Sequence, residues 1–298
     1  MADPRSSSEA VVQDDRVTIF EMGPRDGLQN EARPIPTEDK IRLVDMLTGC
    51  GFAKIEVASF VSPKWVPQMA DGAEVLAGIA RKDGVAYTSI CPNMKGYERA
   101  KDARSDGIGV FGSASDGFSR SNVNCGWEEA LQRALPIVQA AIADGIPVRG
   151  YVSCAVKCPF DGDVDPHQTA HVAKVLYEAG CFEISLGDTI GQGTPESIAA
   201  MLDAVQEVVP AEDLAGHYHD TNGRALENIA ASLEKGVRVF DSAVGGLGGC
   251  PYAPGAKGNV ATEGVVAMMQ REGYETGVDL VALDEAAVFA KSLRSDVI

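Results

Sequence analysis

The sequence predicts a single (β/α)8 barrel, and three observations favour that fold. Short apolar or β-branched runs alternate eight times with amphipathic stretches over about 270 residues, a length typical of such a barrel. No GxGxxG motif follows any run, although an open doubly wound sheet commonly carries one. Polar residues stand where most runs end, as a barrel active site requires. The open sheet is therefore the weaker of the two predictions.

The strand predictions rest on short runs rich in Val, Ile, Phe and Tyr. In chain order they are VTIFEM at 17–22, KIEVA at 54–58, VAYTSI at 85–90, GIGVF at 107–111, IPVRGYVS at 146–153, CFEISL at 181–186, LAGHYH at 214–219 and VRVFDS at 237–242. Helical periodicity predicts helices at 37–50, 67–81, 94–104, 127–143, 167–179, 194–208, 222–235 and 260–272, with an extra C-terminal helix at 279–295.

Capping residues and glycines set the expected helix boundaries. Thr37 is the expected N-cap of the first helix, but Lys40 stands where a capping box needs Glu or Gln. Glycines at 51, 145, 180 and 236 stand where helices should end. No internal repeat or linker is visible. We therefore expect one catalytic barrel domain over 17–298, preceded by a disordered tail over 1–16.

Composition narrows the class of protein. The chain has 298 residues, a formal charge of −17 and an isoelectric point near 4.6, which argues against nucleic-acid binding. Residues 1–16 lack the apolar core of a secretory signal, and no stretch of about 18 apolar residues predicts a membrane span. Seven scattered cysteines predict a reduced, cytoplasmic protein. Cys154-x3-Cys158 lacks a second pair and is interpreted as a non-metal motif.

The end of the seventh predicted strand carries the clearest chemical signal. His217 and His219 are two of only four histidines, and residues two apart on a strand point to the same face. Two imidazoles on one face form half of a divalent metal site. In a barrel, Asp26 and Asn259 can supply oxygen ligands from neighbouring strand ends. A lone histidine would more often be structural, but this pair predicts metal ligation.

Glu56 is expected inside the barrel. It alternates with Ile55 and Val57, so it points inward together with Lys54 and Ala58. A buried carboxylate requires a partner, because an unpaired buried charge is costly. Arg25, on the neighbouring strand end, can supply one.

Several other polar residues follow the strands, and each also has a structural interpretation. Arg25 and Asp26 could form only a local ion pair, and Asp220 could only cap the next helix. The remaining candidates at strand ends are Gln29, Ser59, Arg149, Tyr151, Ser153, Glu183, Ser185 and Asp188.

A glycine-rich segment follows the eighth predicted strand. Six glycines between Gly245 and Gly258 surround Cys250. The segment is either a flexible turn or a mobile lid that brings an exposed, reactive Cys250 over the site. Glycines at this place can also cradle the phosphate of a flavin or sugar. The carboxylates and histidines at the strand ends favour a metal instead.

Six segments carry a resemblance to a known family over about residues 17–295. They are GPRDGLQNE (23–31), SFVSPKWVPQM (59–69), RGYVSC (149–154), EISLGDTIGQGTP (183–195), HYHDTNG (217–223) and GLGGCPYAPGAKGN (246–259). Together they resemble 3-hydroxy-3-methylglutaryl-CoA lyases. GLGGCPYA and SFVSPKWVPQM are specific, whereas HxHD is shared with other metal-dependent condensing enzymes and aldolases on this barrel.

The resemblance implies cleavage of 3-hydroxy-3-methylglutaryl-CoA to acetyl-CoA and acetoacetate, and a homodimer. It implies Mg²⁺ or Mn²⁺ on Asp26, His217, His219 and Asn259. It also implies that Arg25, Glu56 and Cys250 are catalytic, and that Gln29, Ser59, Tyr151 and Asp188 line the substrate site, where we also expect Arg149. In this chemistry His217 or Asp26 removes the hydroxyl proton, Arg25 stabilises the enolate, and Cys250 protonates it.

Some positions depart from the family pattern. Asn222 stands where Tyr is expected, and Asp116 stands where Glu is usual. Residues 116–118 are expected in the loop after the fourth strand, where they could tune the acyl pocket. A lyase for a longer 3-hydroxy-3-alkylglutaryl-CoA is therefore an alternative. A condensing synthase and a catalytically inactive CoA-binding barrel are further alternatives, but the catalytic set is complete.

Overall fold

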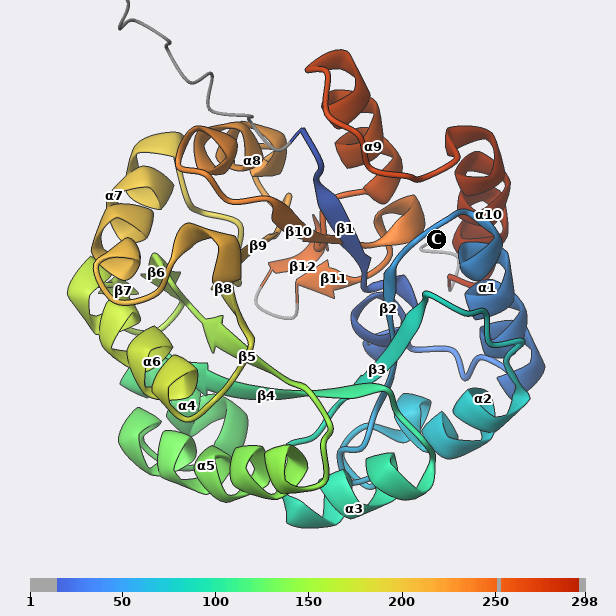
Figure 1. Ribbon diagram of the computed structural model, residues 1–298, viewed down its shortest axis with the longest axis horizontal. Helices are drawn as coiled ribbons and strands as arrows, with labels where there is room; N and C mark the ends of the chain where they lie inside the picture. Colours follow the sequence, from blue (N-terminus) through green and yellow to red (C-terminus); the bar gives the residue numbers. More distant parts are fainter. Residues whose placement is uncertain (1–14, 251–252, 295–298) are drawn as a thin grey trace, which may run out of the picture.

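The computed structural model describes residues 15–250 and 253–294 and contains a closed barrel of parallel strands (Figure 1). The order around the barrel is β1-β10-β9-β8-β5-β4-β3-β2, and every neighbouring pair is parallel. The barrel strands are β1 (Thr18–Glu21), β2 (Lys54–Ser59), β3 (Ala86–Ile90), β4 (Gly107–Ser113), β5 (Val148–Ser153), β8 (Glu183–Asp188), β9 (Leu214–Tyr218) and β10 (Val239–Ser242). The predicted barrel is confirmed.

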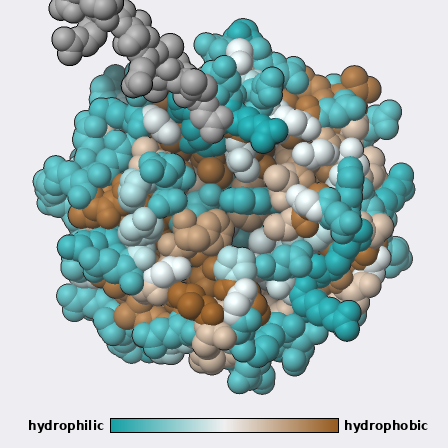
Figure 2. All heavy atoms as spheres, viewed as in Figure 1, coloured by the Kyte–Doolittle hydropathy of each residue, from teal (hydrophilic) through white to brown (hydrophobic). Residues whose placement is uncertain are grey.

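Helices surround the barrel, and hydrophilic side chains form most of the rim of the face in Figure 2. They are α1 (Thr37–Gly49), α2 (Gly72–Gly78), α3 (Met94–Asp102), α4 (Asp116–Val123), α5 (Trp127–Ala143), α6 (Pro166–Glu178), α7 (Pro195–Gln206), α8 (Ala225–Glu234), α9 (Thr262–Arg271) and α10 (Leu280–Ser292). The main hydrophobic core lies between this layer and the strands. Among the described residues, no helix is long and apolar enough to cross a membrane.

Helix α4 and two small hairpins were not predicted. The hairpins pair β6 (Lys157–Cys158) with β7 (Gly162–Asp163), and β11 (Gly249–Cys250) with β12 (Ala253–Lys257). Residues 116–118, expected in a loop, form the first turn of α4 instead. Ser115 caps that turn by accepting a hydrogen bond from the Phe118 N–H. The segment DGFSRSNV is short and polar, so its helical periodicity was too weak to detect.

The start of α1 at Thr37 is as predicted, but its cap and the start of α2 are not. Pro36 occupies the N-cap position of α1, and the Thr37 hydroxyl donates to Asp71 at 2.8 Å instead of capping its own helix. The region 67–81 holds a short 3₁₀ turn at Pro67–Met69 before α2. The glycines expected at helix ends are confirmed, because positions 51, 145, 180 and 236 all have positive φ.

An irregularity in β2 changes the direction of one side chain. The register with β3 shifts between Glu56 and Ala58. Glu56 is buried and points inward as predicted. Ala58 does not, because the shift turns it outward against α2, where a Cβ on Gly72 would lie 2.9 Å from its own Cβ. Most of the expected N-terminal tail, residues 1–14, lies outside the described residues.

Candidate active site

A cavity of about 320 Å³ opens at the carboxyl ends of the barrel strands. Its polar side is lined by Arg25, Asp26, Gln29, Asn30, Ser59, Tyr151, Ser153, Ser185, Thr189, His217 and His219. Its apolar side is lined by Val61, Val66, Ile90, Pro92, Phe111 and Phe118. A cavity of this size, lined by both apolar and polar side chains, is typical of a small-molecule site.

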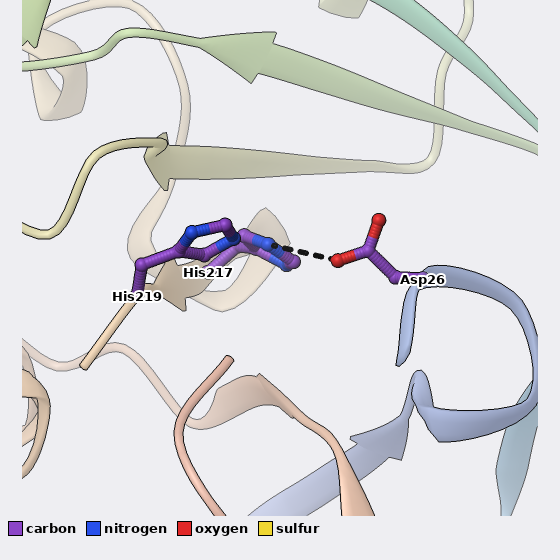
Figure 3. A group of neighbouring side chains, drawn as sticks. All are labelled: Asp26, His217 and His219. Carbon is purple, nitrogen blue, oxygen red and sulfur yellow. Dashed lines mark ion pairs between the residues drawn. The ribbon is translucent and has the colours of Figure 1, made fainter. Parts of the chain in front are cut away.

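Three of the predicted metal ligands line the cavity and lie close together (Figure 3). Asp26, His217 and His219 each offer a ligand atom within 4.8 Å of the others. Nε2 of His217 lies 3.9 Å from Oδ2 of Asp26. Nδ1 of His219 is buried and has no hydrogen-bond partner in the described part of the chain. The group combines one carboxylate with two imidazoles, a set of donors that fits a divalent metal.

Local backbone structure brings these side chains together. Asp26 lies on a π-helical turn, Gly23–Gly27, that follows β1. This turn packs closely on the loop after β10, since a Cβ on Gly27 would lie only 2.6 Å from that of Leu247. His219 lies just past β9 and forms an isolated antiparallel bridge with Asn259.

The fourth predicted ligand, Asn259, also contacts this group. Its Nδ2 donates to Oδ2 of Asp26 at 2.7 Å. The amide therefore presents its nitrogen to the carboxylate in this structure. A half-turn of the amide would present the oxygen instead.

The electrostatics of the ligand group suit a cation. Burial alone would raise the pKa of Asp26, but Arg25 and the two histidines hold it well below its usual value. It is therefore ionised. Burial and the nearby His217 lower the pKa of His219 to about 4, which leaves a neutral imidazole. Burial opposes the charged form of His217, yet the hydrogen bond and charge of Asp241 raise its pKa.

Arg25 joins the ligand group to Glu56. Its guanidinium donates to both Asp26 and Glu56. The other oxygen of Glu56 accepts a hydrogen bond from the Tyr151 hydroxyl at 2.7 Å. Both interpretations of Arg25 are thus realised, the local ion pair and the partner for Glu56. The guanidinium also lines the cavity, which places a fixed positive charge beside the ligand group.

Beneath the ligands, the barrel interior contains a second chain of charges. Arg149 donates two 2.8 Å hydrogen bonds to Asp241 and one of 2.7 Å to Glu183. Lys54 donates to Glu183 from the other side at 3.0 Å. Asp241 was missed at the sequence level, because VRVFDS was interpreted as an apolar run. Its inward position in that run was the available signal.

The remaining predicted residues divide between the cavity and its support. Gln29, Ser59 and Tyr151 line the cavity, as expected of substrate-binding residues. Arg149 lies beneath it. Asp188 is also buried outside the cavity lining, where its carboxylate accepts hydrogen bonds from the N–H groups of residues 192 and 193.

Two predictions concern segments next to the ligand group. Cys250 lies on β11, and its side chain is outside the described residues. Asp220 accepts a hydrogen bond of 3.3 Å from the N–H of Ala225, the first residue of α8, although Arg224 and not Asp220 occupies the N-cap position.

Comparison with known proteins identifies close relatives. A family model described as HMGL-like matches residues 16–289. A 3-hydroxy-3-isohexenylglutaryl-CoA/hydroxymethylglutaryl-CoA lyase from Pseudomonas aeruginosa is 53% identical over 282 residues, 93% of this chain and 94% of that protein. The solved HMG-CoA lyase from Brucella melitensis has a TM-score of 0.93 and 60% identity, over 94% of this chain and 99% of its own.

A third relative was solved with ligands. This HMG-CoA lyase from Acinetobacter baumannii, in complex with coenzyme A and 3-methylmalate, has a TM-score of 0.89 and 36% identity, over 94% of this chain and 92% of its own.

Proposed function

The chain belongs to the HMGL-like family, and on that basis we propose that it is a carbon–carbon lyase that cleaves 3-hydroxy-3-methylglutaryl-CoA to acetyl-CoA and acetoacetate. The observation that carries the proposal is the convergence of Asp26, His217 and His219 beside Arg25 in one cavity. An acyl-CoA substrate is supported by the 36% identical relative in complex with coenzyme A.

The residues present fit a divalent metal, which we propose to be Mg²⁺ or Mn²⁺. Asp26, His217, His219 and Asn259 would hold it, the last after its amide turns. Mixed oxygen and imidazole ligands suit a catalytic ion better than a closed structural zinc site. When bound, such an ion polarises substrate oxygens and lowers the pKa of the C3 hydroxyl.

The protein groups account for the movement of protons and charge. A base takes the proton of the C3 hydroxyl, and the C2–C3 bond breaks as C3 becomes the ketone of acetoacetate. The electron pair passes to C2 and gives a thioester enolate, whose oxygen Arg25 stabilises. The thiol of Cys250 then donates a proton to C2, which yields acetyl-CoA.

Two residues are candidates for the base. Asp26 has two oxygens, so it can hold a metal through one and accept a proton on the other. Its oxygens already accept hydrogen bonds from Arg25 and Asn259. His217 can accept the proton at Nε2 only while that lone pair is free. We propose Glu56 as the residue that orients Arg25, through the hydrogen bond between them.

A longer 3-alkyl substrate is a second candidate, favoured by the apolar side of the cavity. Ile90, Phe111 and Phe118 form part of the apolar wall of the cavity. The 53% identical relative is named for both a methyl and an isohexenyl substrate. We propose that this wall receives the 3-alkyl branch.

Two further properties are proposed on separate grounds. A homodimer follows from the family resemblance, and light scattering of the purified protein tests it. A cytoplasmic location is supported by the cysteines, because the six whose side chains are described are free thiols.

The decisive experiment is a coupled assay of acetyl-CoA release from thioesters with methyl, ethyl and longer 3-alkyl groups. We expect turnover that is lost with a chelator and restored by Mg²⁺ or Mn²⁺. Activity that persists in chelator would refute the metal site. No turnover of any thioester would favour the inactive CoA-binding barrel.

A further inference from the structure

Asp241 lies beside His217 inside the barrel, because the two residues are register partners on the neighbouring strands β10 and β9, and its side chain is fully buried. Its Oδ2 is 3.1 Å from Nδ1 of His217. Because an ionised carboxylate can only accept hydrogen bonds, Nδ1 must carry the hydrogen. The lone pair of the neutral ring is then on Nε2, the nitrogen that lies 3.9 Å from Asp26.

Asp241 is itself fixed in place. Arg149 donates one hydrogen bond to each carboxylate oxygen, both 2.8 Å long. The Ser185 hydroxyl donates to Oδ2 at 2.9 Å. This two-pronged contact with a guanidinium keeps the carboxylate ionised and fixes its plane. Arg149 is held in turn by Glu183. Asp241 therefore cannot rotate away from His217 without breaking a buried ion pair.

We propose that Asp241 is a positioning residue for His217, which fixes the ring and its tautomer so that the Nε2 lone pair faces Asp26 and His219. The inference rests on the proposed function, because it concerns the same metal site. His219 provides the contrast, since its Nδ1 has no partner among the described residues and no carboxylate sets its tautomer. Replacing a carboxylate that orients a metal-ligating histidine typically weakens metal binding about 10- to 100-fold.

The first test is Asp241→Asn. An amide N–H directed at His217 would make Nδ1 an acceptor, move the hydrogen to Nε2 and block ligation there. We expect the dissociation constant for Mn²⁺, measured by the EPR signal of the free ion, to rise about 10- to 100-fold. Asp203→Asn is the matched control, because that side chain is 61% exposed and its loss changes the net charge equally. A folded Asp241→Asn protein that binds Mn²⁺ like wild type would overturn the proposal.

A second measurement needs no substitution of Asp241, so it holds even if that variant does not fold. His167 and His171 are exposed on α6 and can be replaced by Gln, which leaves His217 and His219 as the only histidines. In ¹⁵N-histidine-labelled, metal-free protein at about pH 9, long-range ¹H–¹⁵N spectra report each tautomer. We expect the hydrogen of His217 on Nδ1. A hydrogen on Nε2 would overturn the proposal. If Asp241 had only a structural role, it would not determine which nitrogen of His217 carries the hydrogen.

The same experiments separate this inference from the proposed function. If wild type binds Mn²⁺ and Asp241→Asn binds it equally well, only the positioning role is refuted. If wild type binds no Mn²⁺, the metal site fails and the positioning role fails with it.

Discussion

Glu21 is a buried acid whose ionisation should control stability, and Glu21→Gln tests this. Its side chain joins three segments, because it accepts hydrogen bonds from the N–H groups of Gly23 and Val244 and from the Thr262 hydroxyl. Burial raises the pKa of Glu21 from 4.5 to about 7. Gln has the same shape and can accept from both N–H groups, so the variant should fold.

The direction of the pH dependence follows from proton linkage. Above pH 4.5 the unfolded chain releases the Glu21 proton while the folded protein retains it until about pH 7. The stabilisation linked to the raised pKa is fully present below pH 4.5, and it is lost as the pH rises through about 7. A shift of one pKa unit corresponds to about 1.4 kcal/mol. Between about pH 5 and about pH 8, the free energy of unfolding of wild type should therefore fall by about 2.5 kcal/mol relative to that of Glu21→Gln.

The assay is thermal unfolding of both proteins in chelator, followed by circular dichroism. For a domain of this size, the Tm of the variant minus that of wild type should increase by about 5–10 °C as the pH rises from about 5 to about 8. Glu98→Gln is the matched control, because this carboxylate is exposed on α3. A Tm difference that is the same at both pH values would refute the argument that Glu21 is protonated in the folded protein.

Four further predictions concern the site. Arg25→Gln should lower kcat about 100- to 1000-fold with a smaller change in KM, because the enolate loses its cation, and steady-state kinetics with unchanged kcat would contradict this. Cys250→Ala should lose turnover but keep Mn²⁺ binding, and full turnover with bound metal would exclude its role as proton donor. Gly191→Ala should destabilise the protein by about 1–3 kcal/mol, because φ is +62° and the new Cβ would lie 2.7 Å from the carbonyl oxygen of His219; an unchanged Tm would contradict the clash. Phe118→Ala should raise kcat/KM for longer 3-alkyl thioesters over the methyl substrate about tenfold, and an unchanged ratio would place the alkyl branch elsewhere.

Much of the fold was predictable because its signals are local. Strand and helix periodicities lie within short windows, and their alternation predicted the barrel that β1 and β10 close. The spacing of His217 and His219 placed both imidazoles at one strand end. Once a barrel was assumed, strand ends distant in sequence had to meet, which brought Asp26 and Asn259 to the histidines.

Other features depend on register and on partners distant in the chain. The shift in β2 that turns Ala58 outward leaves no sign in the alternation of residues. In the sequence, Asp241 is one polar residue in an apolar run. Only the folded barrel shows that its carboxylate forms hydrogen bonds with Arg149 and His217. Glu21 likewise gained its partners from segments more than 200 positions away.

By itself, the sequence determined the barrel and the chemical types at its strand ends, because periodicity and residue type are local properties. The tertiary structure decided which buried charges pair, which nitrogen of His217 faces the cavity, and which predicted residues support the site from below. These depend on side-chain positions set by strand register and by the packing of many elements at once. A buried charge is stable only where its partner lies within hydrogen-bonding distance, and that distance exists only in the folded protein.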